Sequence, residues 1–226
     1  MANPGKPLAL ILGVGPGLGA ALARRFAAGG MAVAVAARRK EKLEALAREI
    51  GGKAYACDGT KESDVDGLFA AATKAGGPPR LVVFNAGGYV AKPIAELSAA
   101  EVEGCWRNTC LGGFLVGRAA ARAMLPEGQG TILFTGATAS LRGSARYAAF
   151  AMGKFGLRAL AQSMARELGP RGIHVAHTII DGGIGEAADE SRLAPAALAE
   201  AYWQLHCQAR SAWTLEMDFR PWVEKF

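Results

Sequence analysis

Short apolar runs alternate with longer amphipathic stretches along almost the whole chain. The runs expected to form strands are Leu8–Leu12, Met31–Ala37, Ala54–Cys57, Leu81–Phe84, Thr131–Thr135, His174–Ile180 and Trp213–Phe219. Helical spacing predicts helices over Gly17–Ala28, Glu41–Ile50, Glu62–Ala75, Ser98–Thr109, Gly113–Met124, Ser144–Leu168 and Pro195–Cys207. Buried strands that alternate with helices are typical of a parallel sheet with helices on both faces. The pattern therefore predicts an α/β fold built on a doubly wound parallel sheet.

Neither an internal repeat nor a low-complexity linker interrupts this pattern over the 226 residues. We therefore expect a single domain over residues 1–226. The least patterned segment is Gly182–Ala194, which is rich in small and acidic residues. Together with the helix that follows, it suggests a substrate lid over residues 182–208.

Composition and charge exclude several classes of protein. The net charge of +6 is scattered, and the longest basic block is Arg38-Arg39-Lys40, which argues against a nucleic-acid-binding stripe. No apolar run is long enough to cross a membrane. The four cysteines show no CxxC pairing, so we expect reduced, mostly buried thiols in a cytoplasmic protein. The histidines and cysteines have no metal-ligand spacing, so no metal site is predicted.

A glycine-rich turn joins the first predicted strand to the first predicted helix. It contains Gly13, Gly15, Gly17 and Gly19, with Leu18 before the last glycine. Glycines allow a tight turn and a close approach of the backbone to phosphate, and the helix N-terminus offers free N–H groups. Because the turn lies between a strand and a helix of the first βαβ unit, it predicts a dinucleotide site and a Rossmann-type sheet.

The end of the second strand indicates which dinucleotide is bound. An NAD site usually has an acidic residue here for the ribose 2′-hydroxyl, whereas this chain has Arg38 and Arg39. Two guanidinium groups suit a 2′-phosphate, so NADP is the expected cofactor and NAD the alternative. The arginines could instead simply begin the next helix.

Two further strand ends are expected to line the same cleft. Asp58 follows the third strand, where a short acidic side chain can meet the adenine. Asn85, Ala86 and Gly87 follow the fourth, where small residues leave room beside the cofactor.

Together these motifs resemble the short-chain dehydrogenase/reductase family over nearly the whole chain. The resemblance rests on Gly13, Gly17, Gly19, Asn85, Ala86, Gly87, Asn108, Lys154 and Gly172-Ile173-His174-Val175. It implies a nicotinamide cofactor, a small-molecule substrate and a homodimer or homotetramer. It also implies that Lys154 holds the nicotinamide ribose, that Asn108 holds an ordered water, and that Gly182 and Ile184 contact the cofactor. Asn108 could also simply satisfy a backbone group where Leu111-Gly112-Gly113 breaks the helix.

The active-site positions depart from the family pattern at three points. The tyrosine four residues before the lysine is Phe150, and the serine thirteen residues before that tyrosine is Ala137. The Pro-Gly after the sixth strand is Asp181-Gly182. Phenylalanine cannot donate a proton and alanine cannot donate a hydrogen bond. The family's carbonyl mechanism is therefore not available from these two side chains.

Tyr147 offers a substitute for the missing phenol. Residues seven apart on a helix share a face, and Tyr147 precedes Lys154 by seven. This spacing resembles that of enoyl thioester reductases in the same superfamily, in which a tyrosine interacts with an enolate oxyanion. Alternatively, Tyr147 only covers the start of the helix.

Other polar residues have weaker claims to chemistry. Thr138 could replace the serine or be an ordinary loop hydroxyl, and His177 is expected to be a satisfied core residue. Asp181 could be an acid if buried, but a solvated loop carboxylate is the expected state. Two functions therefore stay open. One is an NADPH-dependent reductase of a small carbonyl compound or an enoyl-thioester-like substrate, with Asn108, Tyr147 and Lys154 at its centre. The other is a catalytically inactive nucleotide-binding sensor or partner subunit.

Overall fold

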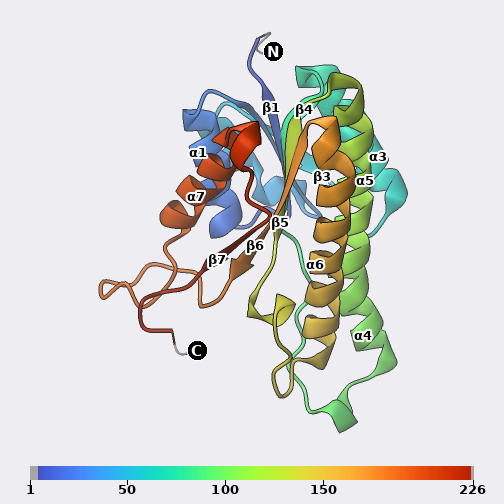
Figure 1. The fold of residues 1–226 in the computed structure, drawn as a ribbon, viewed down its shortest axis with the longest axis vertical. Coiled ribbons are helices and arrows are strands. Elements are labelled where there is room, and N and C mark those ends of the chain that lie inside the picture. Colours follow the sequence, from blue (N-terminus) through green and yellow to red (C-terminus); the bar gives the residue numbers. More distant parts are fainter. Residues whose placement is uncertain (1–4, 225–226) are drawn as a thin grey trace.

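A seven-stranded parallel sheet forms the centre of the molecule (Figure 1). The computed structural model describes residues 5–224. The strand order is β3-β2-β1-β4-β5-β6-β7. The strands are β1 (Leu8–Leu12), β2 (Ala32–Ala37), β3 (Lys53–Ala56), β4 (Pro79–Phe84), β5 (Gly130–Thr135), β6 (Ile173–Ile180) and β7 (Glu216–Phe219). The doubly wound parallel sheet predicted from the sequence is confirmed.

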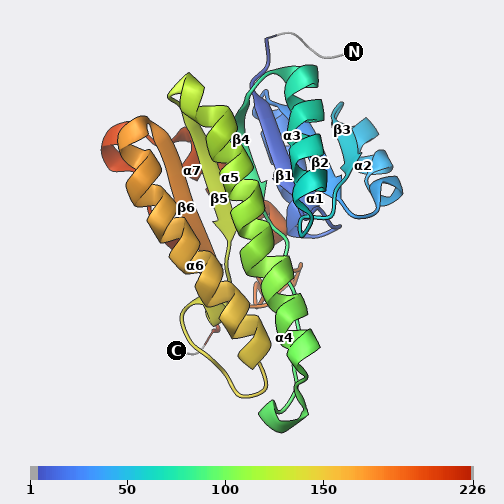
Figure 2. The same ribbon diagram turned by 90° about the vertical axis from the view of Figure 1, so that its right-hand side faces the viewer.

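Helices cover both faces of this sheet. They are α1 (Leu18–Ala28), α2 (Glu44–Glu49), α3 (Glu62–Gly76), α4 (Ala99–Trp106), α5 (Gly112–Met124), α6 (Ala148–Leu168) and α7 (Pro195–Cys207). Helices α1, α2 and α7 pack on one face, and α3, α5 and α6 pack on the other. Helix α4 and the start of α6 project beyond the sheet, as Figures 1 and 2 show. The projecting end lies on the side where the site is built.

Strand β1 shows how the sheet separates two cores. All five of its residues are buried. Leu8, Leu10 and Leu12 belong to the core under α3, α5 and α6, whereas Ala9 and Ile11 belong to the core under α1 and α7. Successive side chains of a strand point to opposite faces, so a continuous apolar run is what burial on both faces requires.

The order of the strands creates a crevice at one edge of the sheet. Strand β1 lies between β2 and β4. The chain therefore proceeds from β1 through β2 to β3 toward one edge of the sheet, and then crosses back to place β4 on the other side of β1. Gly13 N donates to the Ala36 carbonyl at 2.9 Å, and Asn85 N donates to the Leu12 carbonyl at 2.8 Å. Ligands of open α/β sheets bind at such a reversal, beyond the carboxyl ends of the strands.

Two helical stretches differ from the sequence expectation. The stretch predicted as one helix over Glu41–Ile50 is a 3₁₀ turn, Lys40–Lys42, followed by the short helix α2. Helices α4 and α5 are joined without a break by a π-helical turn, Arg107–Leu111. The predicted helix break at Leu111-Gly112-Gly113 is therefore wrong, because Leu111 and Gly112 both keep helical dihedrals.

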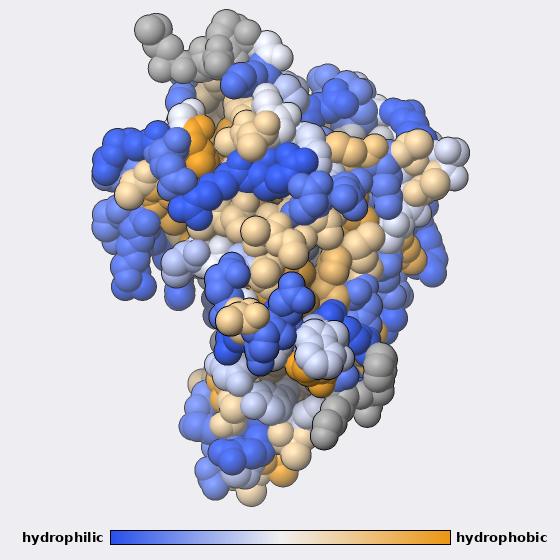
Figure 3. Space-filling view, turned by 90° about the vertical axis from the view of Figure 1, so that its left-hand side faces the viewer, coloured by the Kyte–Doolittle hydropathy of each residue, from blue (hydrophilic) through white to orange (hydrophobic). Residues whose placement is uncertain are grey.

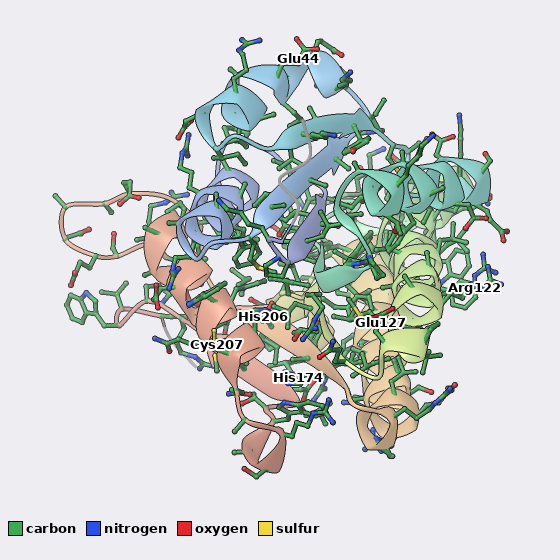
Figure 4. All side chains as sticks on the ribbon, turned by 90° about the horizontal axis from the view of Figure 1, so that it is seen from above. Glu44, Arg122, Glu127, His174, His206 and Cys207 are labelled. Carbon is green, nitrogen blue, oxygen red and sulfur yellow. The ribbon has the colours of Figure 1, made fainter. Side chains whose placement is uncertain are left out.

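Histidines and a cysteine gather at the end of the sheet where β6 begins and α7 ends (Figure 4). His206 Nδ1 lies 2.9 Å from the Thr131 hydroxyl, and His174 stacks on Trp213 with the ring centroids 5.0 Å apart.

Within residues 5–224, no group of three potential ligands is arranged to hold a metal ion. Of the four free cysteines, only Cys57 and Cys105 are buried, so the expectation of mostly buried thiols is half right.

The surface on the side that carries α1 and α7 is mixed in polarity (Figure 3). Hydrophilic residues spread over this side around a central group of apolar ones (Figure 3). Among the described residues, no helix combines the length and the apolar character needed to cross a membrane.

Two glycine-to-alanine substitutions test whether Gly13 is required by its backbone conformation and close packing. Gly13 has a φ of +91°, and a Cβ there would lie 2.5 Å from Ala86 N. We expect Gly13→Ala to lower the free energy of unfolding by about 2 kcal/mol or more, because both the dihedral and the contact are unfavourable. Urea denaturation measures the change.

Gly67→Ala is the matched control. Gly67 lies on the exposed face of α3, and a Cβ there would meet nothing within 4 Å. Alanine should raise the free energy of unfolding by about 0.5–1 kcal/mol through helix propensity. The packing described for the turn would be contradicted if Gly13→Ala left the free energy of unfolding unchanged, or if both variants changed it by the same amount in the same direction.

Candidate functional site

A cleft of about 690 Å³ opens at the carboxyl ends of β1, β2, β3 and β4. Its volume is within the range of small-molecule and cofactor sites. It is lined by Leu12, Gly13, Val14, Gly15, Pro16, Ala20, Arg24, Ala37, Arg38, Arg39, Lys42, Leu43, Ala45, Leu46, Glu49, Cys57, Asp58, Gly59, Thr60, Asn85, Ala86, Gly87 and Asn108. The structure thus brings the predicted glycine turn, arginines and strand-end residues to one site.

The glycine turn forms the floor of the cleft before α1. Gly13 and Gly15 line it, and a Cβ at either Gly15 or Gly17 would meet nothing within 4 Å. Gly17 is the N-cap residue of α1, and Ala20 N donates to the Gly15 and Gly17 carbonyls, so the N–H groups of Leu18 and Gly19 are the ones without an intrahelical partner. This geometry suits a pyrophosphate, which needs an open backbone and a positive helix end.

The other two residues predicted in this turn have packing contacts. Leu18 is buried in the core under α1 and α7. A Cβ on Gly19 would lie 2.8 Å from Val14 Cα. Neither Leu18 nor Gly19 lines the cleft. Any contact of these two residues with a cofactor would come from their backbone N–H groups, and it stays a prediction.

Basic side chains line the end of the cleft beside β2. Arg38 and Arg39 follow β2, and Lys42 reaches the same wall from the 3₁₀ turn. Lys42 was not predicted from the sequence, although its place four residues after Arg38 was a usable signal. Three cations around one wall favour a ligand with phosphate at that end.

Asp58 lies on the facing wall with a fixed carboxylate. It accepts hydrogen bonds from Thr60 N at 3.0 Å and from the Thr60 hydroxyl at 2.8 Å. Burial would raise the pKa of Asp58, but these bonds and the charges of Lys61 and Arg38 hold that pKa below its ordinary value. The carboxylate is therefore an acceptor, as an adenine amino group would require.

Asn85, Ala86 and Gly87 line the cleft between the glycine turn and Lys154. Asn85 Nδ2 donates to the Gly13 carbonyl at 3.1 Å, which fixes the two strand ends against each other. A Cβ on Gly87 would lie 3.5 Å from Lys154 Nζ. Gly87 therefore marks the place where the cleft meets α6.

Lys154 is buried at this far end, with 6% of its surface exposed. Its ammonium donates to the Thr135 carbonyl at 2.7 Å and lies 5.8 Å from the centre of the Phe150 ring. Burial lowers the pKa of Lys154 to about 8. A cation is thus held at a fixed point with its charge only partly compensated.

Asn108 lines the cleft from the π-helical turn. Its Nδ2 donates to the Gly104 carbonyl at 2.7 Å. This leaves the side-chain oxygen as an acceptor toward the cleft. The two roles considered for Asn108, backbone partner and holder of a water, are compatible, and the second stays a prediction.

Tyr147 does not lie within α6, so the helical interpretation of the segment that begins with it is wrong at its first residue. The helix starts at Ala148, and Tyr147 is the N-cap residue with φ −111° and ψ 25°. The preceding Arg146 has a φ of +73°, so the chain enters the helix through a sharp turn. The seven-residue helical spacing to Lys154 therefore does not fix where the phenol points.

The Tyr147 phenol instead contacts a residue that sequence reasoning missed. Tyr89 donates a hydrogen bond from its hydroxyl to that of Tyr147 at 3.3 Å. The Tyr89 ring also packs edge-on against Phe150, with centroids 5.3 Å apart. Tyr89 is 66% exposed, and its place two residues after Gly87 was the available signal. Two phenols and Phe150 form an aromatic group above Lys154.

Asp181 is buried, with 4% of its surface exposed, so the expected solvated loop carboxylate is wrong. Thr138 donates a hydrogen bond to Asp181 Oδ1. Arg220 Nη2 lies 3.6 Å from Asp181 Oδ2. The sequence did not reveal this burial because Arg220, which compensates the charge, comes from the segment after β7.

His177 is fully buried on β6, as expected for a core histidine. Its Nε2 lies 3.3 Å from the Ser140 hydroxyl, and its Nδ1 lies 3.4 Å from Glu216 Oε1. Burial lowers the pKa of His177 to about 4, against the opposing effect of Glu216. Ser140 Oγ also accepts from Ala137 N at 3.2 Å, so His177 anchors the turn that carries Ala137.

The segment predicted as a lid is tied back on itself. Ile184 and Leu193 pair in an isolated parallel bridge, and Gly185 N donates to the Leu193 carbonyl at 3.0 Å. Ile184 also packs against the core under α7. Trp222 Nε1 donates to the Asp189 carbonyl at 3.2 Å. Neither Gly182 nor Ile184 lines the cleft, so their contact with a cofactor stays a prediction.

Comparisons with known proteins identify the family. The family model of the short chain dehydrogenases matches residues 7–189. The chain therefore belongs to the short-chain dehydrogenase family, which confirms the resemblance inferred from its motifs.

Related proteins span several activities. A crystal structure of a short-chain dehydrogenase from Rhodopseudomonas palustris is 46% identical with a TM-score of 0.87, and the match covers 97% of this chain and 100% of that one. A metagenomic short-chain oxidoreductase in complex with NADP is 28% identical with a TM-score of 0.84, covering 96% and 98%. The 3-oxoacyl-[acyl-carrier-protein] reductase of Rattus norvegicus is 32% identical over 167 residues, which are 73% of this chain and 70% of that enzyme.

The desolvation of Lys154 predicts a specific dependence of stability on pH. Its pKa is about 8 in the folded protein and its ordinary value is 10.5, so the unfolded chain binds the proton more tightly between these values. The free energy of unfolding of the wild type, relative to Lys154→Met, should therefore rise from pH 8 to 10.5 and be flat below pH 8. Urea denaturation over this range measures the difference.

Lys74→Met, which removes an exposed lysine of α3, is the control for loss of one charge. A wild-type advantage that stays constant from pH 8 to 10.5 would contradict the desolvated ammonium.

Proposed function

We propose that this protein is an NADPH-dependent oxidoreductase of short-chain dehydrogenase type with an atypical active site. Its substrate would be a small carbonyl compound or an enoyl-thioester-like compound. The observation that supports this most is the continuity of the site: a cleft with a phosphate-binding turn and three cations at one end meets Lys154 at Gly87. Bound NADPH would supply a hydride.

The preference for NADP rests on the wall beside β2. Arg38, Arg39 and Lys42 offer cations where an NAD site has a carboxylate. The metagenomic relative was solved in complex with NADP, which supports the same assignment. The residues present therefore fit the dinucleotide at its 2′-phosphate, its pyrophosphate and its adenine.

In this proposal the chain's own residues divide the work at the nicotinamide end. Lys154 would hold the ribose by its fixed ammonium, and Asn108 would hold a water with its free amide oxygen. Tyr147 would stabilise the substrate oxyanion. The Tyr147 hydroxyl accepts the hydrogen bond from Tyr89, so its own proton stays available for donation to the substrate. Accepting that bond also polarises the Tyr147 hydroxyl and strengthens it as a hydrogen-bond donor.

A second candidate is a nucleotide-binding sensor or partner subunit without turnover. It is favoured by one observation: Phe150, not a phenol, lies against Lys154. The two candidates share cofactor binding and differ in whether a hydroxyl reaches the reacting atom.

The remaining features of the proposal concern context. We infer one nucleotide-binding domain over residues 1–226, with residues 182–208 shaping the substrate pocket, and a cytoplasmic location in keeping with the free cysteines. We also infer a homodimer or homotetramer. Four exposed large apolar side chains support self-association, and they lie on α4, α5 and α6: Trp106, Phe114, Met152 and Phe155.

Arg38→Asp tests the cofactor assignment. Replacing a cation by a carboxylate should weaken NADPH binding by about 10- to 100-fold, the value of one or two charge-assisted hydrogen bonds, and should not weaken NADH binding. Titration of tryptophan fluorescence gives both dissociation constants. Arg48→Asp, on α2 but outside this cleft, is the matched control. Tighter binding of NADH than of NADPH by the wild type would refute the assignment.

Tyr147→Phe tests the oxyanion role. We expect the rate of NADPH oxidation with a panel of enones, enoyl thioesters and diketones to fall by about 100-fold, as for loss of one oxyanion donor. Tyr55→Phe removes a phenol on β3, at the opposite edge of the sheet, and should leave the rate unchanged. If Tyr147→Phe matches the wild type, the phenol has no chemical role. A wild type that binds NADPH but is inert with the whole panel favours the sensor.

A further inference from the structure

An ion pair between α1 and α2 lies at the cleft. Arg24, on α1, donates from Nε to Oε1 of Glu49 at 2.6 Å and from Nη2 to Oε2 at 2.9 Å. Glu49 is the last residue of α2. Both side chains line the cleft, and about half of each is exposed to solvent. The pair is therefore accessible to whatever ligand the cleft binds.

The helices that carry the pair also position the cationic part of the cleft. Helix α1 follows the glycine turn, and α2 follows the wall beside β2 with its three cations. Ala20, one turn before Arg24, and Leu46, one turn before Glu49, also line the cleft. The pair thus lies on the helix faces that are turned toward the cleft. Ala20 and Leu46 are buried and apolar, and apolar walls strengthen the field of charges in a cleft.

Glu49 brings a negative charge into this part of the cleft. Among the described residues that line the cleft, Glu49 and Asp58 carry the carboxylates. The Asp58 carboxylate accepts two hydrogen bonds from Thr60, whereas both oxygens of Glu49 are held by Arg24. Hydrogen bonding from Arg24 holds the pKa of Glu49 below its ordinary value, so Glu49 is ionised at neutral pH. Without Arg24, this carboxylate would oppose the binding of an anion.

We propose that Arg24 is a cofactor-specificity residue that acts through Glu49. By neutralising this carboxylate, Arg24 allows the cations of the wall beside β2 to bind the 2′-phosphate of NADP without opposition. This role rests on the proposed function, because it requires NADP as the cofactor. In this role Arg24 favours NADP through charge, and no hydrogen bond to the phosphate is required.

The balance of charge gives each residue of the pair a distinct signature. Together Arg24 and Glu49 add no net charge to the cleft. Loss of Arg24 alone leaves an extra negative charge, and loss of Glu49 alone leaves an extra positive one. A phosphate monoester carries roughly two negative charges at neutral pH, so the two losses should change NADPH affinity in opposite directions. Loss of both residues' charges restores the balance.

NADH provides the internal reference for this effect. The pyrophosphate is common to both cofactors, so the ratio of their dissociation constants isolates the 2′-phosphate. Charges that act at a distance are also screened by salt, because the Debye length falls from about 10 Å at 0.1 M to about 3 Å at 1 M. An effect of Arg24 through charge should therefore fade at high salt, whereas a mechanical effect should not.

Mechanical fastening of α1 to α2 is the competing explanation. An exposed ion pair contributes little to stability, but it could still hold the two helices at the right separation. In that case loss of either partner should weaken the binding of both cofactors alike, and the double variant should bind no better. Arg118 and Glu62 form a similar pair between α5 and α3, outside the cleft, so Arg118→Gln is the matched control.

The experiment measures the dissociation constants of NADPH and NADH for each variant by tryptophan fluorescence, at about 0.1 M and about 1 M NaCl. At the lower salt, Arg24→Gln should raise the dissociation constant of NADPH relative to that of NADH by about 3- to 10-fold, and Glu49→Gln should lower it by a similar factor. The double variant should return to within about twofold of the wild type. All these differences should shrink at the higher salt, and Arg118→Gln should match the wild type throughout.

The outcomes distinguish the role of Arg24 from the cofactor assignment on which it rests. A wild type that prefers NADPH while Arg24→Gln keeps the same ratio overturns the role of Arg24 and leaves the assignment intact. Equal weakening of both cofactors, without rescue by Glu49→Gln, also overturns it, in favour of mechanical fastening. A wild type that binds NADH more tightly than NADPH overturns both. Should Arg24→Gln not fold, Glu49→Gln still decides the matter, because an unchanged ratio in that variant contradicts a role through charge.

Discussion

The close approach of β1 to β4 at Gly13 is the constraint on which the site depends. The left-handed backbone of Gly13 lets the chain turn out of β1 while lying almost in contact with the backbone of Ala86. Asn85 then bonds back to the Gly13 carbonyl. Because these two strand ends are locked together, the start of α1 and the segment from Asn85 to Gly87 face each other across one cleft.

The charges of the site are distributed unevenly along that cleft. Arginine and lysine side chains crowd the wall beside β2, where they remain accessible to a ligand. At the other end, Lys154, His177 and Asp181 are all buried. The first end is suited to attract and hold an anion, and the second to keep a few polar groups at fixed positions. The two groups of charged side chains therefore differ in how far a ligand can reach them.

The sequence predicted the parts of the structure that depend on local pattern. The strands, the glycine turn and the arginines after β2 all follow from periodicity or from position at a strand end. What it could not predict depends on contacts between distant segments. Asp181 is buried because Arg220 reaches it, and Tyr147 bonds Tyr89, which is 58 residues away.

The predicted start of α6 is wrong for a related reason. Helix propensity alone predicts a helix that begins at Ser144. Because Arg146 has a left-handed backbone, the helix instead begins at Ala148, with Tyr147 as its N-cap residue. The backbone N–H of Lys92 donates to the Arg146 carbonyl at 2.8 Å, which ties this turn to the segment after β4. A tertiary hydrogen bond thus accompanies a boundary that local preference did not set.

The π-helical turn at Arg107–Leu111 also has a consequence for the register of the whole helical layer. A π turn accommodates one more residue than an α-helical turn, so it works as a built-in insertion between α4 and α5. Because the wider turn absorbs this residue in place, α4 and α5 keep the faces that they would have in a continuous α-helix. Deleting one residue there would let the turn relax to α-helix and leave the buried face of α5 on the sheet, but it would change the backbone that carries Asn108 at the cleft. The extra residue therefore sets the position of one amide side chain without altering the packing of the 13-residue helix that follows.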